Sequence, residues 1–252
     1  MKTTYRNFIL DPQQRFIFAY VPKVACTNWK CLMRYMAGLD DWLNAGLAHD
    51  KQNGGLRYLD LSGPDRYFLE DPGIPKYAMV RNPYSCTLSA YLNKIESRIP
   101  NLENTESTDP FDRMTRSVDN YRKNKLDTDK HPTVDYYSFL SWMENSPDPN
   151  TKNEHWAPQT DLLLHPDVKF DFLGRFENLA EDSERILSAM ECSQRFPSQK
   201  EVRFAPTGAV DKLQKYYGPD EQESVARLLK NDLDAYGYGN PLKGDREQNI
   251  EA

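Results

Sequence analysis

The pattern that most constrains the fold of this chain is a repeated strand–loop–helix unit. A short apolar segment with β-forming residues, RFIFAYV (15–21), is followed by a loop and then by apolar residues at helical spacing over 29–36. The same order recurs with KYAMVR (76–81) and with KFDFLGRF (169–176), each of which leads into an amphipathic helix. Alternating strands and helices predict an α/β domain with a mostly parallel sheet covered by helices on both faces. We expect one domain over residues 1–252.

The remaining segments predict further elements. GLRYLDL (55–61) reads as another strand, and TVDYYSFLSWMEN (133–145) as a helix with Thr133 as its N-cap. A closing helix is expected over 218–238. Residues 98–132 are polar and charged without a clear period, which predicts a long loop, a lid or an insertion.

Composition narrows the class of protein. The net charge of −6 argues against a general nucleic-acid binder. No apolar run approaches the roughly 20 residues of a membrane span, and no signal segment opens the sequence, so we expect no membrane span. The cysteines have neither metal-ligand spacing nor a disulfide framework, which favours a reduced, cytoplasmic location without a bound metal. These cysteines are Cys26, Cys31, Cys86 and Cys192.

The first loop, PKVACTN (22–28), has the features of an anion site although it lacks glycine. A turn from a strand into a helix leaves free backbone N–H groups, and the helix dipole favours negative charge there. Lys23 adds a positive charge, and the small Ala25 would allow an anion to approach the backbone. Alternatively, Thr27 only caps the helix and Lys23 is a solvated surface residue.

The second loop suggests a second anion. Arg81 ends the strand 76–81, and Ser89 follows about two helical turns later. A guanidinium can bind a phosphate with two parallel hydrogen bonds, and a serine hydroxyl can donate another. The alternative is a buried ion pair for Arg81 and a packing role for Ser89. Two such loops predict a ligand with two separate anionic groups.

Five motifs, in order, resemble the membrane-anchored carbohydrate sulfotransferases of the chondroitin and dermatan type. They are VPKVACTNWK, VRNPYSCTLSAY, EHWAPQTDLLLHP, FDFLGRFENLAEDSERIL and LLKNDLDAYGY. The resemblance covers roughly residues 15–238. It implies a P-loop-like, three-layer α/β fold without the glycine-rich loop. It also implies 3′-phosphoadenosine-5′-phosphosulfate (PAPS) as sulfuryl donor and no metal.

The resemblance also implies roles for individual residues. The first loop would hold the 5′-phosphosulfate of PAPS, with Lys23 at the bridging oxygen. The residues of this loop are Pro22, Lys23, Val24, Ala25, Cys26, Thr27 and Asn28. Arg81 and Ser89 would hold the 3′-phosphate, and Thr207 and Gly208 would approach the nucleotide. The sulfuryl group would pass in line to an acceptor hydroxyl.

Several positions depart from the family. Asn82 stands where the family usually has an acid, and Cys31 and Ser85 stand where it often has arginine. The paired cysteines after the HW motif are absent. With the net charge of −6, the lost basic residues argue against a heavily sulfated polysaccharide. They leave a carbohydrate or another small acceptor.

A hydroxyl acceptor needs a general base, and histidine suits neutral pH. His49 lies between the two nucleotide motifs, and His155 lies in the HWAPQ motif. We favour His155, because Trp156 and Pro158 beside it indicate an ordered wall. Either histidine could instead be structural, with a carboxylate such as Glu70 or Glu154 as the base.

Two other functions stay open. A P-loop phosphotransferase would need the GxxxxGK[ST] loop, which the sequence lacks. A non-catalytic nucleotide-binding module would keep the fold and lose the chemistry. Some aromatic residues could also line an adenine or sugar slot. The candidates are Tyr91, Trp156 and Tyr217.

Overall fold

The computed structural model describes residues 5–243, and these fall into two compact units. In this described part, the first unit comprises residues 5–81 and 158–206, and the second comprises residues 82–157 and 207–243. Each unit is described by itself below.

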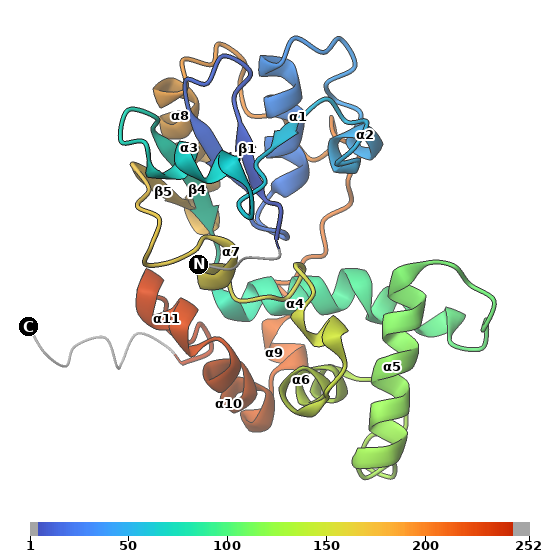
Figure 1. The fold of residues 1–252 in the computed structure, drawn as a ribbon. Helices are drawn as coiled ribbons and strands as arrows, with labels where there is room; N and C mark the ends of the chain where they lie inside the picture. The colour runs from blue at the N-terminus through green and yellow to red at the C-terminus, as the bar shows by residue number, and fades with distance from the viewer. Residues whose placement is uncertain (1–4, 244–252) are drawn as a thin grey trace, which may run out of the picture. The chain divides into compact units, whose positions relative to one another are not determined.

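The first unit is built on a five-stranded sheet with the order β3-β1-β2-β4-β5 (Figure 1). Its strands are β1 (Phe8–Leu10), β2 (Ile17–Ala19), β3 (Arg57–Tyr58), β4 (Lys76–Val80) and β5 (Phe172–Arg175). β2, β4 and β5 run parallel, whereas β1 pairs antiparallel with β2 and with β3. The predicted α/β class is confirmed.

The expectation of a mostly parallel sheet is wrong, because two of the four strand pairings are antiparallel. The antiparallel half begins with a β1–β2 hairpin. At its turn the Asp11 carboxylate accepts hydrogen bonds from the backbone N–H groups of Gln13 and Arg15. β1 has only three residues, all buried, so it shows no alternating pattern by which a sequence would predict it.

The helices of the first unit are α1 (Cys26–Met36), α2 (Ala45–His49), α3 (Tyr67–Glu70), α7 (Gln159–Leu162) and α8 (Leu179–Ala189). Among them, α8 packs against β5 and α2 packs against α1. On α1 the Trp29 ring lies 4.5 Å from the ring of Phe18 on β2, and its indole N–H donates to the sulfur of Met79 on β4 at 3.2 Å. This contact fixes the start of α1 at the carboxyl end of β2. Gly38, with φ of 75°, follows the C-cap Ala37 of α1, in a left-handed conformation that suits glycine at the end of a helix.

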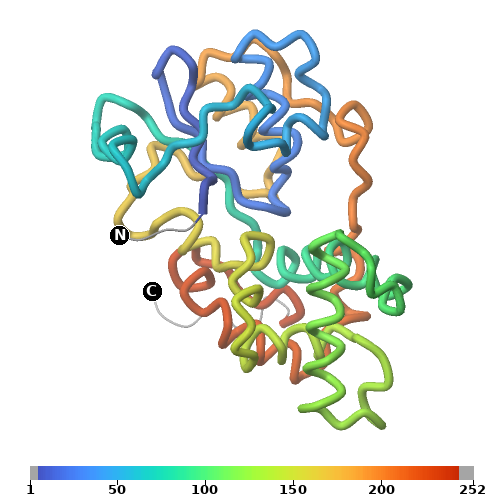
Figure 2. Tube along the Cα trace, turned by 45° about the vertical axis from the view of Figure 1, so that its right-hand side comes forward, coloured from blue at the N-terminus to red at the C-terminus, as the bar shows by residue number. Residues whose placement is uncertain are grey.

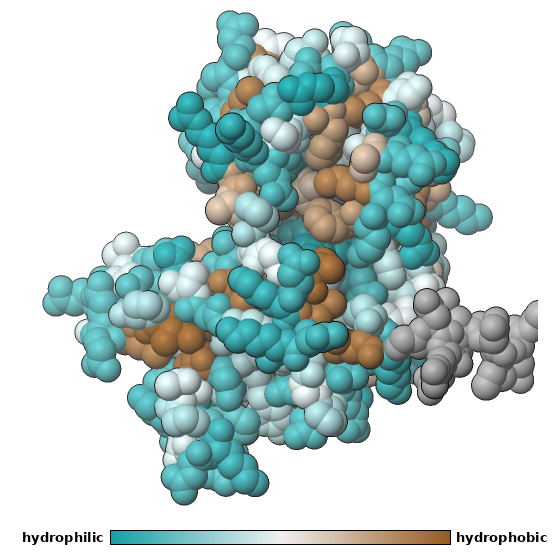
Figure 3. Space-filling view, turned by 180° about the vertical axis from the view of Figure 1, so that it is seen from behind, coloured by the Kyte–Doolittle hydropathy of each residue, from teal (hydrophilic) through white to brown (hydrophobic). Residues whose placement is uncertain are grey.

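The second unit is helical in its described part. It contains α4 (Pro83–Lys94), α5 (Pro110–Lys125), α6 (Tyr136–Asn145), α9 (Leu213–Tyr216), α10 (Pro219–Leu228) and α11 (Lys230–Tyr236). Its core is rich in aromatic rings, among them Tyr91, Tyr136, Phe139, Trp142 and Trp156. On the face drawn in Figure 3, hydrophilic residues cover most of the surface of both units and hydrophobic ones gather in patches.

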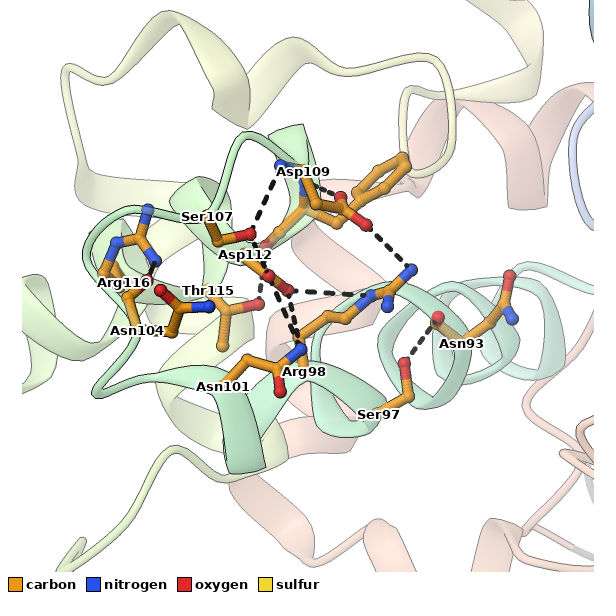
Figure 4. A network of polar contacts seen from close by, with 11 residues as sticks. Asn93, Ser97, Arg98, Asn101, Asn104, Ser107, Asp109, Asp112, Thr115 and Arg116 are labelled. Carbon is orange, nitrogen blue, oxygen red and sulfur yellow. Dashed lines mark hydrogen bonds and ion pairs between the residues drawn. The ribbon is translucent and has the colours of Figure 1, made fainter.

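The segment 98–132 is not a long loop, because α5 occupies residues 110–125 and buries Met114, Thr115 and Val118. Before it, a polar network ties the chain down: Arg98 forms an ion pair with Asp109, and Ser107 donates to the Asp112 carboxylate (Figure 4). The sequence shows no helical period here because a polar residue, Asp112, occupies the buried face of α5, where an apolar residue would be expected. Whether this segment acts as a lid stays a prediction.

Two helix ends also differ from the expectation. α6 is capped by Asp135, whose carboxylate accepts from the backbone N–H of Ser138, and not by Thr133. The closing helix is divided into α10 and α11 at Leu229. Within residues 5–243, no helix has the length and hydropathy that a membrane crossing requires.

Candidate functional site

The loop between β2 and α1 takes up a conformation usually associated with glycine. Lys23 and Ala25 have φ values of 68° and 49°, both in the left-handed region. The N–H of Val24 donates to the carbonyl of Val21 at 3.2 Å and closes the turn. Non-glycine residues in this region store backbone strain, which concentrates at functional sites. The glycine-poor sequence therefore does not prevent a tight loop.

The start of α1 offers backbone donors to an anion. Ala25 is the N-cap, and among the described residues no side chain caps α1 and no acid stands in its first turn. The first N–H groups of a helix have no partner inside it, and the helix dipole places partial positive charge there. Cys26, Thr27 and Asn28 form this first turn, where the sequence predicted an anion site.

Arg81 lies against this loop, so the two sequence motifs of the first unit meet. Its Nη1 donates to the Lys23 carbonyl at 2.9 Å, and its guanidinium lies 4.3 Å from the centroid of the Phe176 ring. Gln159 fixes the Arg81 backbone from both sides, accepting from its N–H at 2.9 Å and donating to its carbonyl at 2.7 Å. Arg81 is only 5% exposed, so its charge acts in a partly desolvated place.

His49, the last residue of α2, also reaches the loop. Its Nε2 shares a hydrogen bond of 2.9 Å with the hydroxyl of Thr27, and the His49 side chain is exposed. Thr27 is therefore not the cap of α1, because Ala25 holds that position and the Thr27 hydroxyl bonds His49 instead. Asn28, in contrast, donates its amide N–H to the carbonyl of Pro197 at 2.8 Å, which ties the segment after α8 to α1 (Figure 2).

A groove opens between α8 and residues 192–199, with a volume of about 860 Å³. Asn28 contributes to its wall, so the groove begins beside the first turn of α1. Phe196, which packs edge-on against Trp29 with ring centroids 4.9 Å apart, offers an aromatic wall, and Leu187 an aliphatic one. The volume is in the range of small-molecule sites, with apolar walls and a few polar groups.

In the second unit, Ser89 and Thr207 lie together although 118 residues separate them. Their hydroxyl oxygens are 2.9 Å apart. Ser89 is buried in α4, and Gly208 has φ of 61°, which suits glycine. The carbonyl of Thr207 accepts from the Lys212 ammonium at 2.9 Å. The motif serine and the loop before α9, both predicted to contact the nucleotide, thus form one polar cluster.

His155 belongs to the second unit. Its Nδ1 lies 2.8 Å from the amide oxygen of Asn153, and its ring meets that of Phe111 edge-on at 5.1 Å. A carbonyl oxygen can only accept, so in the neutral ring Nδ1 carries the proton and Nε2 keeps its lone pair. His131, by contrast, stacks on Tyr137 and pairs with Asp135.

The three aromatic residues considered for an adenine or sugar slot are buried in the second core. These are Tyr91, Trp156 and Tyr217. Glu70 is paired with Arg66 on the surface. Sequence reasoning missed Gln159, Phe176 and Phe204, which surround Arg81 and Lys23. Gln159 stands in the HWAPQ motif and Phe176 directly follows β5, but nothing in the sequence indicates which cation each would meet.

Within residues 5–243, no three His, Cys, Asp or Glu side chains come together as a metal site.

A family model described as "Sulfotransferase family" matches residues 6–239, which is most of the chain. The chain belongs to the sulfotransferase family. Carbohydrate sulfotransferase 14 of Homo sapiens is 30% identical over 79% of this chain and 51% of its own length. Carbohydrate sulfotransferase 14 of Danio rerio is 28% identical over 96% and 64%. Carbohydrate sulfotransferase 11 of Mus musculus is 26% identical over 94% and 68%.

The resemblance predicted from the five motifs is thus confirmed. The chain spans 51% to 64% of the length of the carbohydrate sulfotransferase 14 relatives. No solved structure matches it.

Proposed function

We propose that this member of the sulfotransferase family transfers the sulfuryl group of PAPS to a hydroxyl of a carbohydrate or another small acceptor. One observation carries the proposal: the strained loop that presents Lys23 and the first turn of α1 is held by Arg81, at 2.9 Å from Nη1 to the Lys23 carbonyl. Two cations and a row of backbone donors in one place suit a doubly anionic nucleotide. The names of the carbohydrate sulfotransferase relatives support the acceptor class.

In this proposal the loop residues 22–28 bind the 5′-phosphosulfate and Arg81 binds the 3′-phosphate. Ser89, Thr207 and Gly208 stay predicted nucleotide-binding residues of the second unit. The groove of about 860 Å³ beside Asn28 supports an adenine position against Phe196. We further propose that the first unit is P-loop-like, since β2, the loop and α1 have the order of that motif and β4 runs parallel to β2.

The reaction moves one sulfuryl group. The acceptor oxygen forms a bond to sulfur as the bond between sulfur and the bridging oxygen breaks, and the bisphosphate leaves with that oxygen's negative charge. The Lys23 ammonium stabilises this charge as it grows. The N–H groups at the start of α1 stabilise charge on the sulfuryl oxygens. The acceptor proton passes to a general base.

Two histidines are candidates for this base, for different reasons. His49 contacts the donor loop through Thr27, which supports it by position. His155 has its Nδ1 fixed by Asn153, which supports it by the tautomer that leaves Nε2 as a proton acceptor. We propose His49, because a base must reach the hydroxyl that attacks sulfur and His49 borders the loop proposed to hold that group.

The two other functions predict different ligands. A phosphotransferase should bind ATP with magnesium, and a non-catalytic module should bind the bisphosphate without turning over PAPS. We would titrate the purified chain with 3′-phosphoadenosine-5′-phosphate, AMP and magnesium ATP by calorimetry, and then measure label transfer from ³⁵S-PAPS to panels of sugars. Preference for the bisphosphate together with label transfer supports a sulfotransferase. Binding of magnesium ATP alone would overturn the proposal.

A further inference from the structure

The ring of Phe204 faces the ammonium of Lys23. The Nζ atom of Lys23 lies 5.6 Å from the ring centroid, within the distance over which a cation is attracted to an aromatic face. Phe204 is 38% exposed, and among the described residues it shares this exposure with only two other large hydrophobic side chains, Tyr67 and Val210. An exposed ring beside the principal cation of the loop needs a reason other than core packing.

The backbone around Phe204 is held by contacts with neighbouring residues. The N–H of Phe204 donates to the carbonyl of Gln199 at 3.1 Å. Two residues earlier, Val202 is fully buried against Cys31 and Ala48, in a small core beside α1 and α2. Glu201 adds a link, since its carboxylate accepts from the backbone N–H of Ser198 at 2.8 Å. The ring is therefore presented from a held segment.

We propose that Phe204 is a positioning residue whose aromatic ring holds the Lys23 ammonium at the donor loop without neutralising it. The inference rests on the proposed role of Lys23 as the cation at the bridging oxygen. The Lys23 backbone is already fixed, because its carbonyl accepts from Arg81 at 2.9 Å. The ring contact restricts the four-carbon side chain and so reduces the rotamer freedom that is lost when the donor binds.

The chemistry of the contact explains why a ring suits this place. A carboxylate would also hold an ammonium, as Glu201 holds Arg195 elsewhere in this unit. Its full negative charge would then oppose the approach of a phosphosulfate. The face of an aromatic ring attracts a cation through its quadrupole and carries no net charge. The loop keeps its positive charge while the cation is ordered.

Arg81 is oriented in the same way, with its guanidinium 4.3 Å from the centroid of the Phe176 ring. Both cations of the first unit that we assign to the donor thus contact a phenylalanine face. Because the second contact uses a different residue on a different element, it supports the ring as a means of holding these charges.

The first test measures the position of Lys23 without any turnover. Reductive ¹³C-methylation keeps the charge of lysines, and the Lys23 signal is assigned by its loss in Lys23→Arg. A ring current from Phe204 should shift this signal away from those of exposed lysines. Phe204→Leu should return it to their position, and Phe204→Tyr should keep the shift. Tyr67→Leu is the matched control, since Tyr67 is another exposed aromatic residue of this unit.

The second test measures chemistry, as the release of sulfate from PAPS to water with no other acceptor. An exposed cation–π contact of this kind corresponds to about a two- to fivefold change in rate. Phe204→Leu should lower the rate by about that factor and change the dissociation constant of the bisphosphate less. Phe204→Tyr should restore the rate, and Tyr67→Leu should leave it unchanged.

The results separate the two hypotheses. If the wild type does not bind the bisphosphate, the proposed function fails, while the Lys23 signal still reports whether the ring holds the ammonium. If Phe204→Leu lowers the rate and leaves the Lys23 signal in its wild-type position, the ring acts on the substrate and the inference is overturned. An unchanged signal and an unchanged rate in Phe204→Leu would overturn it as well.

Discussion

Replacing Arg81 is the most direct test of the proposed nucleotide recognition. The guanidinium is 5% exposed, donates to the Lys23 carbonyl at 2.9 Å and lies on the Phe176 ring. In the proposed function this group would contact a phosphate in a partly desolvated place, where a hydrogen bond to a charged group contributes about 1.5–3 kcal/mol. Arg81→Ala should therefore weaken binding of 3′-phosphoadenosine-5′-phosphate about 10- to 150-fold.

AMP separates the two roles of this residue, because it lacks the 3′-phosphate. The wild type should bind the bisphosphate more tightly than AMP. If Arg81→Ala lowers the affinity for both ligands equally, the change reflects the loop that Arg81 supports. Any additional loss of affinity for the bisphosphate reflects the contact with the 3′-phosphate. The affinity of Arg81→Lys for the bisphosphate should lie between those of the wild type and Arg81→Ala, because lysine keeps the charge but lacks the planar guanidinium.

Calorimetry gives the dissociation constants of the bisphosphate and of AMP, and thermal unfolding checks that the variants fold. Arg66→Ala is the control, because Arg66 is an exposed arginine paired with Glu70, and such surface pairs contribute little. Equal losses for the bisphosphate and AMP in Arg81→Ala would refute the assignment of Arg81 to the 3′-phosphate.

Three further predictions follow from the site. Lys23→Ala should lower the turnover of saturating PAPS more than it weakens bisphosphate binding, because the leaving group gains its charge only in the transition state; unchanged turnover would contradict this. His49→Ala should lower turnover by about 10²–10⁴ and leave bisphosphate affinity nearly intact, whereas the opposite ranking with His155→Ala would make His155 the base. The hydrogen bond from Arg195 lowers the pKa of Glu201 from 4.5 to about 2. This stabilisation is complete above pH 4.5 and is lost as the pH falls toward 2, so the melting temperatures of wild type and Glu201→Gln should converge there.

Local patterns in the sequence were enough to locate the two strand–loop–helix motifs and the family. The helical spacing from Trp29 to Met36 and the apolar run of β4 persist in the structure because each depends on neighbours within a few residues. The loop of residues 22–25 follows from the same local order, although its positive φ values at Lys23 and Ala25 could not be predicted from non-glycine residues.

Only the tertiary structure decided how these parts are completed. The three-residue strand β1 makes the sheet mixed. Its antiparallel pairing with β2 and β3 could not be predicted from a local hydrophobic pattern. Arg81 meets the Lys23 carbonyl across 58 residues, and Ser89 meets Thr207 across 118. The contacts of Phe176 with Arg81 and of Phe204 with Lys23 also join residues far apart in the sequence. A sequence shows which side chains carry charge or hydroxyl groups, but the distance between them is set by the packing of strands and helices far apart in the chain.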